Sequence, residues 1–328
     1  MKALIRDRYG PPDVLDVRDV ARPVPKDDQV LVRVHAASIN DWDWGLLHEP
    51  TFPIFGRGGT PRVRILGSDI AGRVAEVGNR VQRFKPGDEV FGDLSAYGGW
   101  GGFAEYVCAS EKRLAPKPAR MTFEQAAALP QAGQLAVQAI FTAGPLRAGQ
   151  KILINGAGGG VGTIGIQLAK MHDVDVTGVD SELKHEMMRR IGFDHVIDYT
   201  KEDFTRDGRR YDLIVDTKTT RSAADYARAL NPGGTYATVG GPSIATLFKI
   251  PLEGLWFRLA ERKTLRLVGL RTNRDLPYLC ERFEAGQLLP VIDGPYSLNE
   301  AREAFRRFGA GRQMGKIVIT ISHEGHEI

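Results

Sequence analysis

The sequence predicts an α/β protein with two domains, a small domain of short strands and a doubly wound parallel sheet. Residues 1–121 hold short apolar runs separated by turn signals such as Gly78-Asn79 and Pro86-Gly87, which is typical of a compact, barrel-like β domain. After Met121, strands and helices alternate, which favours a parallel sheet covered by helices. A length of 328 residues accommodates both domains.

The expected elements follow from hydrophobic periodicity and from capping signals. In the β domain the expected strands are 2–6, 15–20, 30–35, 70–77, 89–92 and 103–109. A capping box at Thr122-Phe123-Glu124-Gln125 starts a helix that Pro130 interrupts, and a second helix runs over 131–143. The parallel sheet then takes strands 151–155, 174–179, 196–197, 212–216, 235–239 and 265–270, with helices at 161–171, 182–191 and 222–230. A helix near 275–285 and a strand at 317–321, which returns to the first domain, complete the chain.

The glycine-rich turn between the first strand and helix of the parallel sheet carries the clearest functional signal. Its strictly spaced form is Ala157-x-Gly159-x-x-Gly162, and Asp180 follows 18 residues later at the end of the next strand. Glycines allow a tight turn and close approach of a pyrophosphate, and the helix N-terminus favours negative charge. We therefore expect dinucleotide binding by Ala157, Gly158, Gly159, Gly160, Val161 and Gly162. The alternative is a structural βαβ crossover that binds nothing.

Composition and charge exclude several classes of function. Apolar residues are 42% and charged residues 26%, and the net charge of +4 comes from scattered positions, so we expect no nucleic-acid partner. No apolar run approaches the ~20 residues that cross a bilayer, and the N-terminus is too polar for a signal peptide, so we expect no membrane association. Cys108 and Cys280 alone form no disulfide framework, which favours the cytoplasm.

Five segments together resemble the zinc-independent branch of the medium-chain dehydrogenase/reductase superfamily, the quinone oxidoreductase and enone reductase group. They are LGSDIAGRVAEVGNRVQRFKPGDEVFG (66–92), AAALP (126–130), GAGGGVGTIGIQLAK (156–170), GFDHVIDYTKEDF (192–204) and MGKIVIT (314–320). The resemblance implies a GroES-like catalytic domain formed by 1–122 and 274–328. It also implies a Rossmann dinucleotide-binding domain at 123–273.

The resemblance argues against a metal. Zinc-dependent relatives place a cysteine where this chain has Asn40 and a histidine where it has Ser68. Asparagine and serine do not replace these ligands. The stretch 93–102 has no cysteine for a structural zinc. We therefore expect a metal-free protein.

The residues after the second Rossmann strand bear on the choice of coenzyme. Asp180 favours NADH, because an acid there bonds the ribose hydroxyls and repels a 2′-phosphate. Ser181 and Lys184 favour NADPH, because they offer a donor and a positive charge to that phosphate. Tyr199 also favours NADPH, because it matches a family tyrosine that packs beside the 2′-phosphate. Three features against one favour NADPH slightly. Thr217, Gly240 and Gly241 end later strands where the coenzyme should lie, and Lys316 aligns with a basic residue that touches the pyrophosphate in relatives.

The candidate catalytic residue is Asn40, which matches a family asparagine beside the nicotinamide and whose amide can polarise a carbonyl. The alternative is a loop residue that bonds its own backbone. Asp43 matches a family aspartate that holds this loop, and Gly45 stands where several quinone reductases have a tyrosine, so no essential acid is expected. Trp42, Trp44 and Phe52 are candidates for an aromatic substrate wall, with ordinary packing as the alternative.

These observations predict a metal-free NAD(P)H-dependent oxidoreductase that transfers hydride to a quinone or an α,β-unsaturated carbonyl. The first alternative is a zinc-independent carbonyl reductase or alcohol dehydrogenase. The second is an NADPH-binding sensor or scaffold with little turnover. We expect a homodimer in which the strand at 265–270 pairs across a twofold axis.

Overall fold

The computed structural model describes residues 1–49, 56–57, 60–95, 99–241 and 244–323. The chain divides into two compact units. Unit 1 comprises Met1–Gln131, Thr272–Glu284 and Ile292–Ile328, and unit 2 comprises Ala132–Arg271 and Ala285–Val291. The sequence placed the first boundary at 122/123. In the structure, helix α2 (Phe123–Ala127) belongs to unit 1, because it packs on the strands of that unit.

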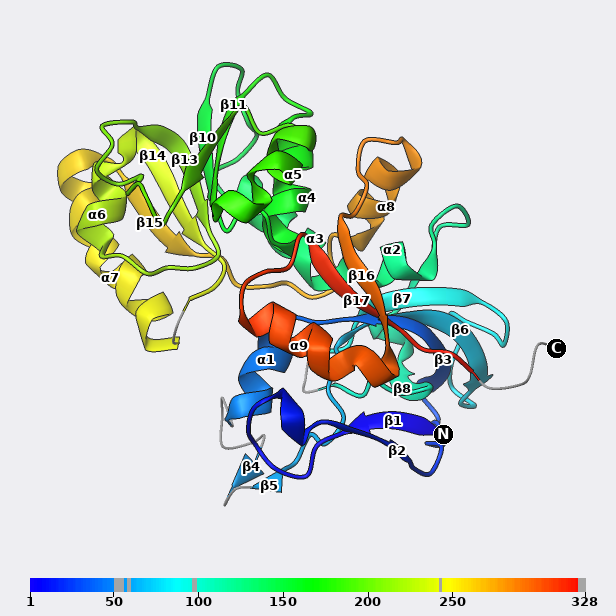
Figure 1. Ribbon diagram of the computed structural model, residues 1–328. Coiled ribbons are helices and arrows are strands. Elements are labelled where there is room, and N and C mark those ends of the chain that lie inside the picture. Colours follow the sequence, from blue (N-terminus) through cyan, green and yellow to red (C-terminus); the bar gives the residue numbers. More distant parts are fainter. Residues whose placement is uncertain (50–55, 58–59, 96–98, 242–243, 324–328) are drawn as a thin grey trace. The chain divides into compact units, whose positions relative to one another are not determined.

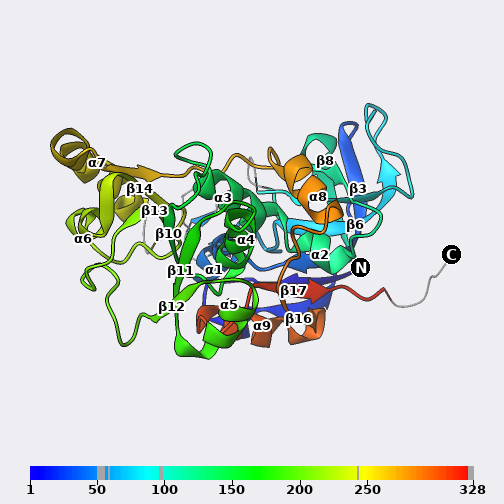
Figure 2. The ribbon, with the colours of Figure 1, turned by 90° about the horizontal axis from the view of Figure 1, so that it is seen from above.

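Unit 2 contains a six-stranded sheet in which every neighbouring pair is parallel. Its order is β12 (His195–Asp198), β11 (Asp175–Asp180), β10 (Lys151–Asn155), β13 (Tyr211–Asp216), β14 (Leu230–Thr238) and β15 (Thr264–Leu267). Figure 2 shows β12 at one side of this unit and α7 at the other. The chain order reverses between β10 and β13, which is where ligands bind at the carboxyl ends of such sheets. The doubly wound sheet of the sequence prediction is confirmed.

Helices flank this sheet. They are α3 (Pro130–Ile140), α4 (Gly160–Ala169), α5 (His185–Arg190), α6 (Ala223–Arg228) and α7 (Ile244–Glu261). Helix α4 packs on β10 and β11, whereas α7 packs on β14 and β15 (Figure 1). The sequence analysis missed α7, because it contains Pro251 and its apolar residues do not keep to one face.

Unit 1 is built on a seven-stranded sheet that joins strands from the N-terminal and C-terminal parts of the chain. Its order is β16 (Ile292–Ser297), β17 (Lys316–Thr320), β3 (Gln29–Ser38), β6 (Asp69–Val77), β7 (Glu89–Asp93) and β9 (Ala115–Pro116), and β8 (Tyr106–Ser110) also pairs with β3. Two small pairs accompany it, β1 (Lys2–Ile5) with β2 (Asp16–Asp19) and β4 (Gly56–Arg57) with β5 (Thr60–Pro61). The antiparallel pairing of β17 with β3 confirms the predicted return of the last strand.

Helix α8 (Leu276–Glu284) was expected, whereas α1 (Asp41–His48) and α9 (Ala301–Gly309) were not. A signal for α9 was present, because Ser297 and Glu300 form a capping box just before it. Helix α9 buries Ala301, Ala304 and Phe305.

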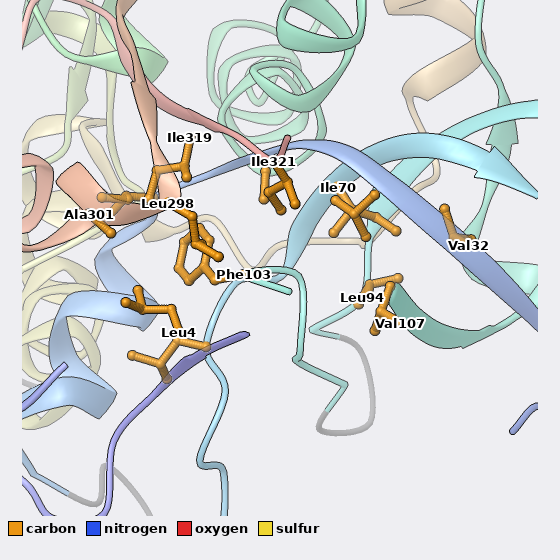
Figure 3. Packing of buried hydrophobic residues seen from close by; sticks show 14 of the residues in the cluster. Leu4, Val32, Ile70, Leu94, Phe103, Val107, Leu298, Ala301, Ile319 and Ile321 are labelled. Atoms are coloured by element: carbon orange, nitrogen blue, oxygen red, sulfur yellow. The ribbon is translucent and has the colours of Figure 1, made fainter. Parts of the chain in front are cut away.

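The core of unit 1 joins residues from the N-terminal strands and the C-terminal segment. Leu4, Val32, Ile70 and Phe103 belong to one buried cluster with Leu298 and Ile319, and Figure 3 shows Phe103 beside Leu298. The Phe103 and Phe305 rings meet edge to face with centroids 5.8 Å apart, a favoured aromatic geometry. Burial of this shared core ties the final strand to the first domain.

No helix among the described residues combines the length and hydropathy that a membrane crossing requires.

Candidate functional site

The glycine turn of unit 2 joins β10 to α4, and two of its glycines are required by their surroundings. Gly156 has φ +82°, and a Cβ there would lie 2.1 Å from Thr217 Oγ1. A Cβ on Gly162 would lie 2.4 Å from the Ala157 carbonyl oxygen. The turn therefore holds α4 against β10 without side chains between them.

The start of α4 offers hydrogen-bond donors to an anion. Gly159 is the N-cap, and Gly160, Val161 and Gly162 form the first turn. The first N–H groups of a helix have no acceptor inside the helix, and the helix dipole adds partial positive charge there. This arrangement fits the pyrophosphate of a dinucleotide.

Asp180, at the end of β11, is held from several sides. Its Oδ2 accepts the Gly158 N–H at 2.9 Å, and its Oδ1 accepts the Ser181 N–H at 2.9 Å. Lys184 Nζ lies 3.1 Å from Oδ1, and the two side chains are only 4% and 9% exposed. Lys184 is therefore a buried partner of Asp180, and its contact with a 2′-phosphate stays a prediction. Burial keeps the Lys184 ammonium against Asp180.

The other predicted coenzyme residues of unit 2 lie beyond the carboxyl ends of β12, β13 and β14. Tyr199 directly follows β12, and its side chain is exposed. Thr217 follows β13 and donates its hydroxyl to the Asn155 carbonyl at 3.1 Å. Gly240, beyond β14, accepts a bond from Thr238 Oγ1 at 2.9 Å, and Gly241 is exposed.

In unit 1, strand register assembles a second polar cluster. Val318 pairs with Ser38, Ser38 pairs with Asp69, and Asp69 pairs with Asp93 across neighbouring strands. Lys316 begins β17 two residues before Val318, and Asn40 follows β3 two residues after Ser38. Antiparallel pairing therefore brings Lys316 beside Asn40. Charged and polar side chains thus lie close together at the ends of four neighbouring strands, β17, β3, β6 and β7.

Lys316 is buried in this cluster, with 5% of its surface exposed. Its Nζ donates to the Ile39 carbonyl at 2.9 Å and to Asn40 Oδ1, and it lies 3.7 Å from Asp69 Oδ2. Two of the three N–H donors of this ammonium group are therefore used by acceptors in unit 1, and Asp69 is its ion-pair partner. The expected contact of Lys316 with the pyrophosphate stays a prediction.

Asn40 and Asp43 join the same cluster to the start of α1. They form a capping box in which Asp43 Oδ2 accepts the Asn40 N–H at 2.9 Å. Asp43 Oδ1 also accepts the Gly67 N–H at 2.8 Å, so this carboxylate holds two loops, as expected. The Asn40 Nδ2 lies 3.5 Å from Ser68 Oγ. The two positions that carry zinc ligands in zinc-dependent relatives are thus adjacent here.

Burial sets the electrostatics of the cluster. Desolvation raises the pKa of Asp43 to about 6, although the N–H groups of Gly67 and Asn40 offset part of this effect. Desolvation also raises the pKa of Asp69 and lowers that of Lys316, while the attraction between the two opposes both shifts. Asp69 Oδ2 accepts the Gln131 N–H at 3.1 Å. The sequence analysis missed Asp69 as a site residue, because only strand pairing places it beside Asn40.

The three aromatic candidates for a substrate wall differ in position. Trp42 is 38% exposed. The Trp44 ring packs on Phe308 of α9 at 6.2 Å between centroids, and a Cβ on Gly309 would lie 2.0 Å from it. Trp44 therefore serves packing in unit 1. Phe52 lies outside the described residues.

No group of three or more His, Cys, Asp and Glu side chains in the described part of the chain is arranged to hold a metal ion. A parallel sheet with a glycine turn at its switch point, joined to a β unit that receives the last strand, defines a dinucleotide-dependent oxidoreductase fold.

Comparison with known proteins identifies the family. Residues 26–119 match the alcohol dehydrogenase GroES-like domain, and residues 191–319 match the zinc-binding dehydrogenase domain. The chain is 34% identical to the 2-methylene-furan-3-one reductase of Solanum lycopersicum, over 97% of this chain and 79% of the relative. It is 30% identical to the chloroplastic quinone oxidoreductase QR1 of Triphysaria versicolor, over 97% of this chain and 98% of the relative.

A solved quinone oxidoreductase structure from Coxiella burnetii superposes with a TM-score of 0.84 at 29% identity, over 98% of this chain and 99% of that one. The chain belongs to the medium-chain dehydrogenase/reductase superfamily, among its quinone and enone oxidoreductases. It is an NAD(P)H-dependent oxidoreductase of this group.

Proposed function

We propose that this protein reduces a quinone or an α,β-unsaturated carbonyl with NADPH and without a metal ion. The observation that carries the proposal is the buried Asn40 amide, which occupies the place of a zinc ligand in zinc-dependent relatives and whose oxygen accepts from Lys316. Because the amide oxygen accepts from Lys316, the amide nitrogen can donate a hydrogen bond to a substrate. A carbonyl oxygen that gains negative charge during hydride transfer needs such a donor.

The glycine turn of unit 2 and the polar cluster around Asn40 in unit 1 have different tasks in the proposed reaction. When bound, the nicotinamide supplies the hydride. The first turn of α4 holds the pyrophosphate, and Asn40 donates to the substrate oxygen. We propose that solvent supplies the proton, since Gly45 stands where several relatives have a tyrosine.

A substrate panel tests this function. Under anaerobic conditions with NADPH, we expect turnover of a 2-alkenal and of a quinone, and little turnover of a simple saturated ketone. Faster reduction of the ketone would favour a carbonyl reductase instead. Tight NADPH binding without turnover of any compound would favour a sensor or scaffold.

The preference for NADPH rests on the pairing of Asp180 with Lys184. An isolated acid at this position repels a 2′-phosphate. Here the Lys184 ammonium, 3.1 Å away, neutralises that charge inside the fold. The exposed Tyr199 ring and the Ser181 hydroxyl remain to contact the phosphate.

We further propose that two copies of this chain form a dimer through α7 and β15. Four large apolar side chains of α7 are exposed: Leu252, Leu255, Trp256 and Leu259, at 75%, 56%, 61% and 79%. Their spacing of three, four and seven residues places them on one helix face. Helix α7 packs on β15, which ends the order of the six-stranded sheet, so this helix lies beside a strand edge that no other described strand pairs with (Figure 1). A second copy can cover both features at once.

Replacing Leu255 and Leu259 together by glutamate should convert the dimer into a monomer. Burying two carboxylates in an apolar interface costs more free energy than the interface gains on association. Light scattering coupled to size exclusion measures the mass. The matched control is Leu289→Glu, which changes another exposed leucine of unit 2. A monomeric wild type, or an unchanged mass in the double variant, would refute this interface.

Both cysteines are free thiols, which supports a reducing compartment. We propose a cytoplasmic protein whose partners are its small-molecule substrate and its own second copy, and neither nucleic acid nor membrane.

A further inference from the structure

We propose that Lys316 is a positioning residue that holds the Asn40 amide with its oxygen inward, so that Asn40 presents a hydrogen-bond donor to the substrate. This proposal rests on the proposed function, in which Asn40 polarises a carbonyl oxygen. It assigns Lys316 to the substrate side of the chemistry rather than to the coenzyme.

The chemistry of the two side chains makes the orientation unambiguous. A lysine ammonium can only donate, whereas an amide has an accepting oxygen and a donating nitrogen. The atom of Asn40 that faces Lys316 Nζ must therefore be Oδ1. The nitrogen then lies on the other side of the amide, 3.5 Å from Ser68 Oγ. That distance exceeds an ordinary N–H···O bond. The amide also donates a hydrogen bond to the Asp69 carboxylate, and because an amide nitrogen carries two N–H groups, the second one is the donor that we assign to the substrate.

Lys316 is itself held in place. Its second donor goes to the Ile39 carbonyl at 2.9 Å, and Asp69 Oδ2 lies 3.7 Å from the same nitrogen. Asp69 is fully buried and is oriented by the Gln131 N–H. A buried cation with two hydrogen bonds and an ion-pair partner costs much to move, so the amide has little freedom to turn.

The consequence of a reversed amide is large. A carbonyl or quinone oxygen is only an acceptor, so a reversed Asn40 would direct Oδ1 at it and repel the developing negative charge. Without Lys316 the amide loses the donor that holds Oδ1 inward, and the productive orientation is less favoured. The proposal therefore predicts a defect in turnover rather than in coenzyme binding.

The experiment compares Lys316→Met with Asn40→Ser, which keeps a helix-capping side chain but removes the amide. We expect Asn40→Ser to lower kcat about tenfold to a hundredfold. Lys316→Met should lower kcat about tenfold, with the Kd for NADPH within about threefold of wild type. In the double variant Asn40→Ser with Lys316→Met, kcat should equal that of Asn40→Ser, because two residues that act through one group are not additive.

Methionine leaves Asp69 buried without its cation and can reduce stability. The variant Lys316→Met with Asp69→Asn removes both charges, and it should unfold near the wild-type temperature while kcat stays low. Lys85→Met, at an exposed lysine of unit 1, is the control for lost charge. Recovery of kcat in the Lys316/Asp69 variant would overturn the proposal. A tenfold weaker Kd for NADPH with unchanged kcat would overturn it in favour of a pyrophosphate contact.

A readout without turnover separates this proposal from the proposed function. The side-chain NH2 resonances of Asn40, identified by their loss in Asn40→Ser, should shift in Lys316→Met and stay in place in Lys85→Met. If the wild type turns over no substrate but these resonances shift as expected, the proposed function fails and the orientation stands. If they do not shift, the orientation itself is refuted.

Discussion

The variant Gly162→Ala should lose about 1–3 kcal/mol of unfolding free energy and bind NADPH at least roughly tenfold more weakly. The added Cβ would lie 2.4–2.6 Å from three backbone atoms of Ala157. Backbone atoms cannot turn aside as a flexible side chain can, so α4 must move away from β10. The first-turn N–H groups move with it and lose their alignment with the pyrophosphate. Thermal denaturation and nicotinamide fluorescence titration measure the two effects.

Gly165→Ala is the matched control on the same helix. A Cβ there meets Ile154 Cδ1 at 3.4 Å, an ordinary contact. Alanine also favours a helix over glycine by about 0.8–1.0 kcal/mol. We expect this variant to be at least as stable as the wild type, with unchanged NADPH affinity. Equal behaviour of the two variants would show that the close approach at Gly162 has no role.

Removing the cation beside Asp180 should reverse the coenzyme preference. In Lys184→Met, the negative charge of Asp180 remains without its partner and faces the 2′-phosphate. We expect the Kd for NADPH to rise about tenfold, or about 1.4 kcal/mol, while that for NADH changes little. The opposite variant, Asp180→Ser, should strengthen NADPH binding by about 1 kcal/mol or more. Fluorescence titration with both coenzymes measures the ratio.

Lys170→Met controls for the loss of one positive charge from unit 2, because Lys170 pairs with Asp194 at another place. Its ratio of NADPH to NADH affinity should match the wild type. A wild type that prefers NADH tenfold would refute the coenzyme assignment. An unchanged ratio in Lys184→Met would show that Asp180 does not act on the phosphate.

Local signals were sufficient for much of the fold. The six strands of the parallel sheet follow from short apolar runs between turn signals, and the glycine turn marks the coenzyme end because its residues are contiguous. Helices α1 and α7 were not predicted. Helix α1 has a capping signal in Asn40 and Asp43 but is short and rich in tryptophan, and α7 contains a proline and is apolar on several sides. The boundary at α2 also needed the structure, because a capping box shows where a helix starts and not which unit it packs on.

The superfamily, the two-part architecture and the glycine turn could be predicted from the sequence, since their signals are contiguous segments of the chain. The partners of Lys184 and Lys316 became visible only in the fold. The charge of Lys184 and the resemblance at Lys316 suggested that both lysines touch the coenzyme. In the fold, Lys184 pairs with Asp180, and Lys316 bonds Asn40, 276 positions away in the chain. A lysine is a donor wherever it lies, and its partner is set by burial and strand register, which depend on the whole fold.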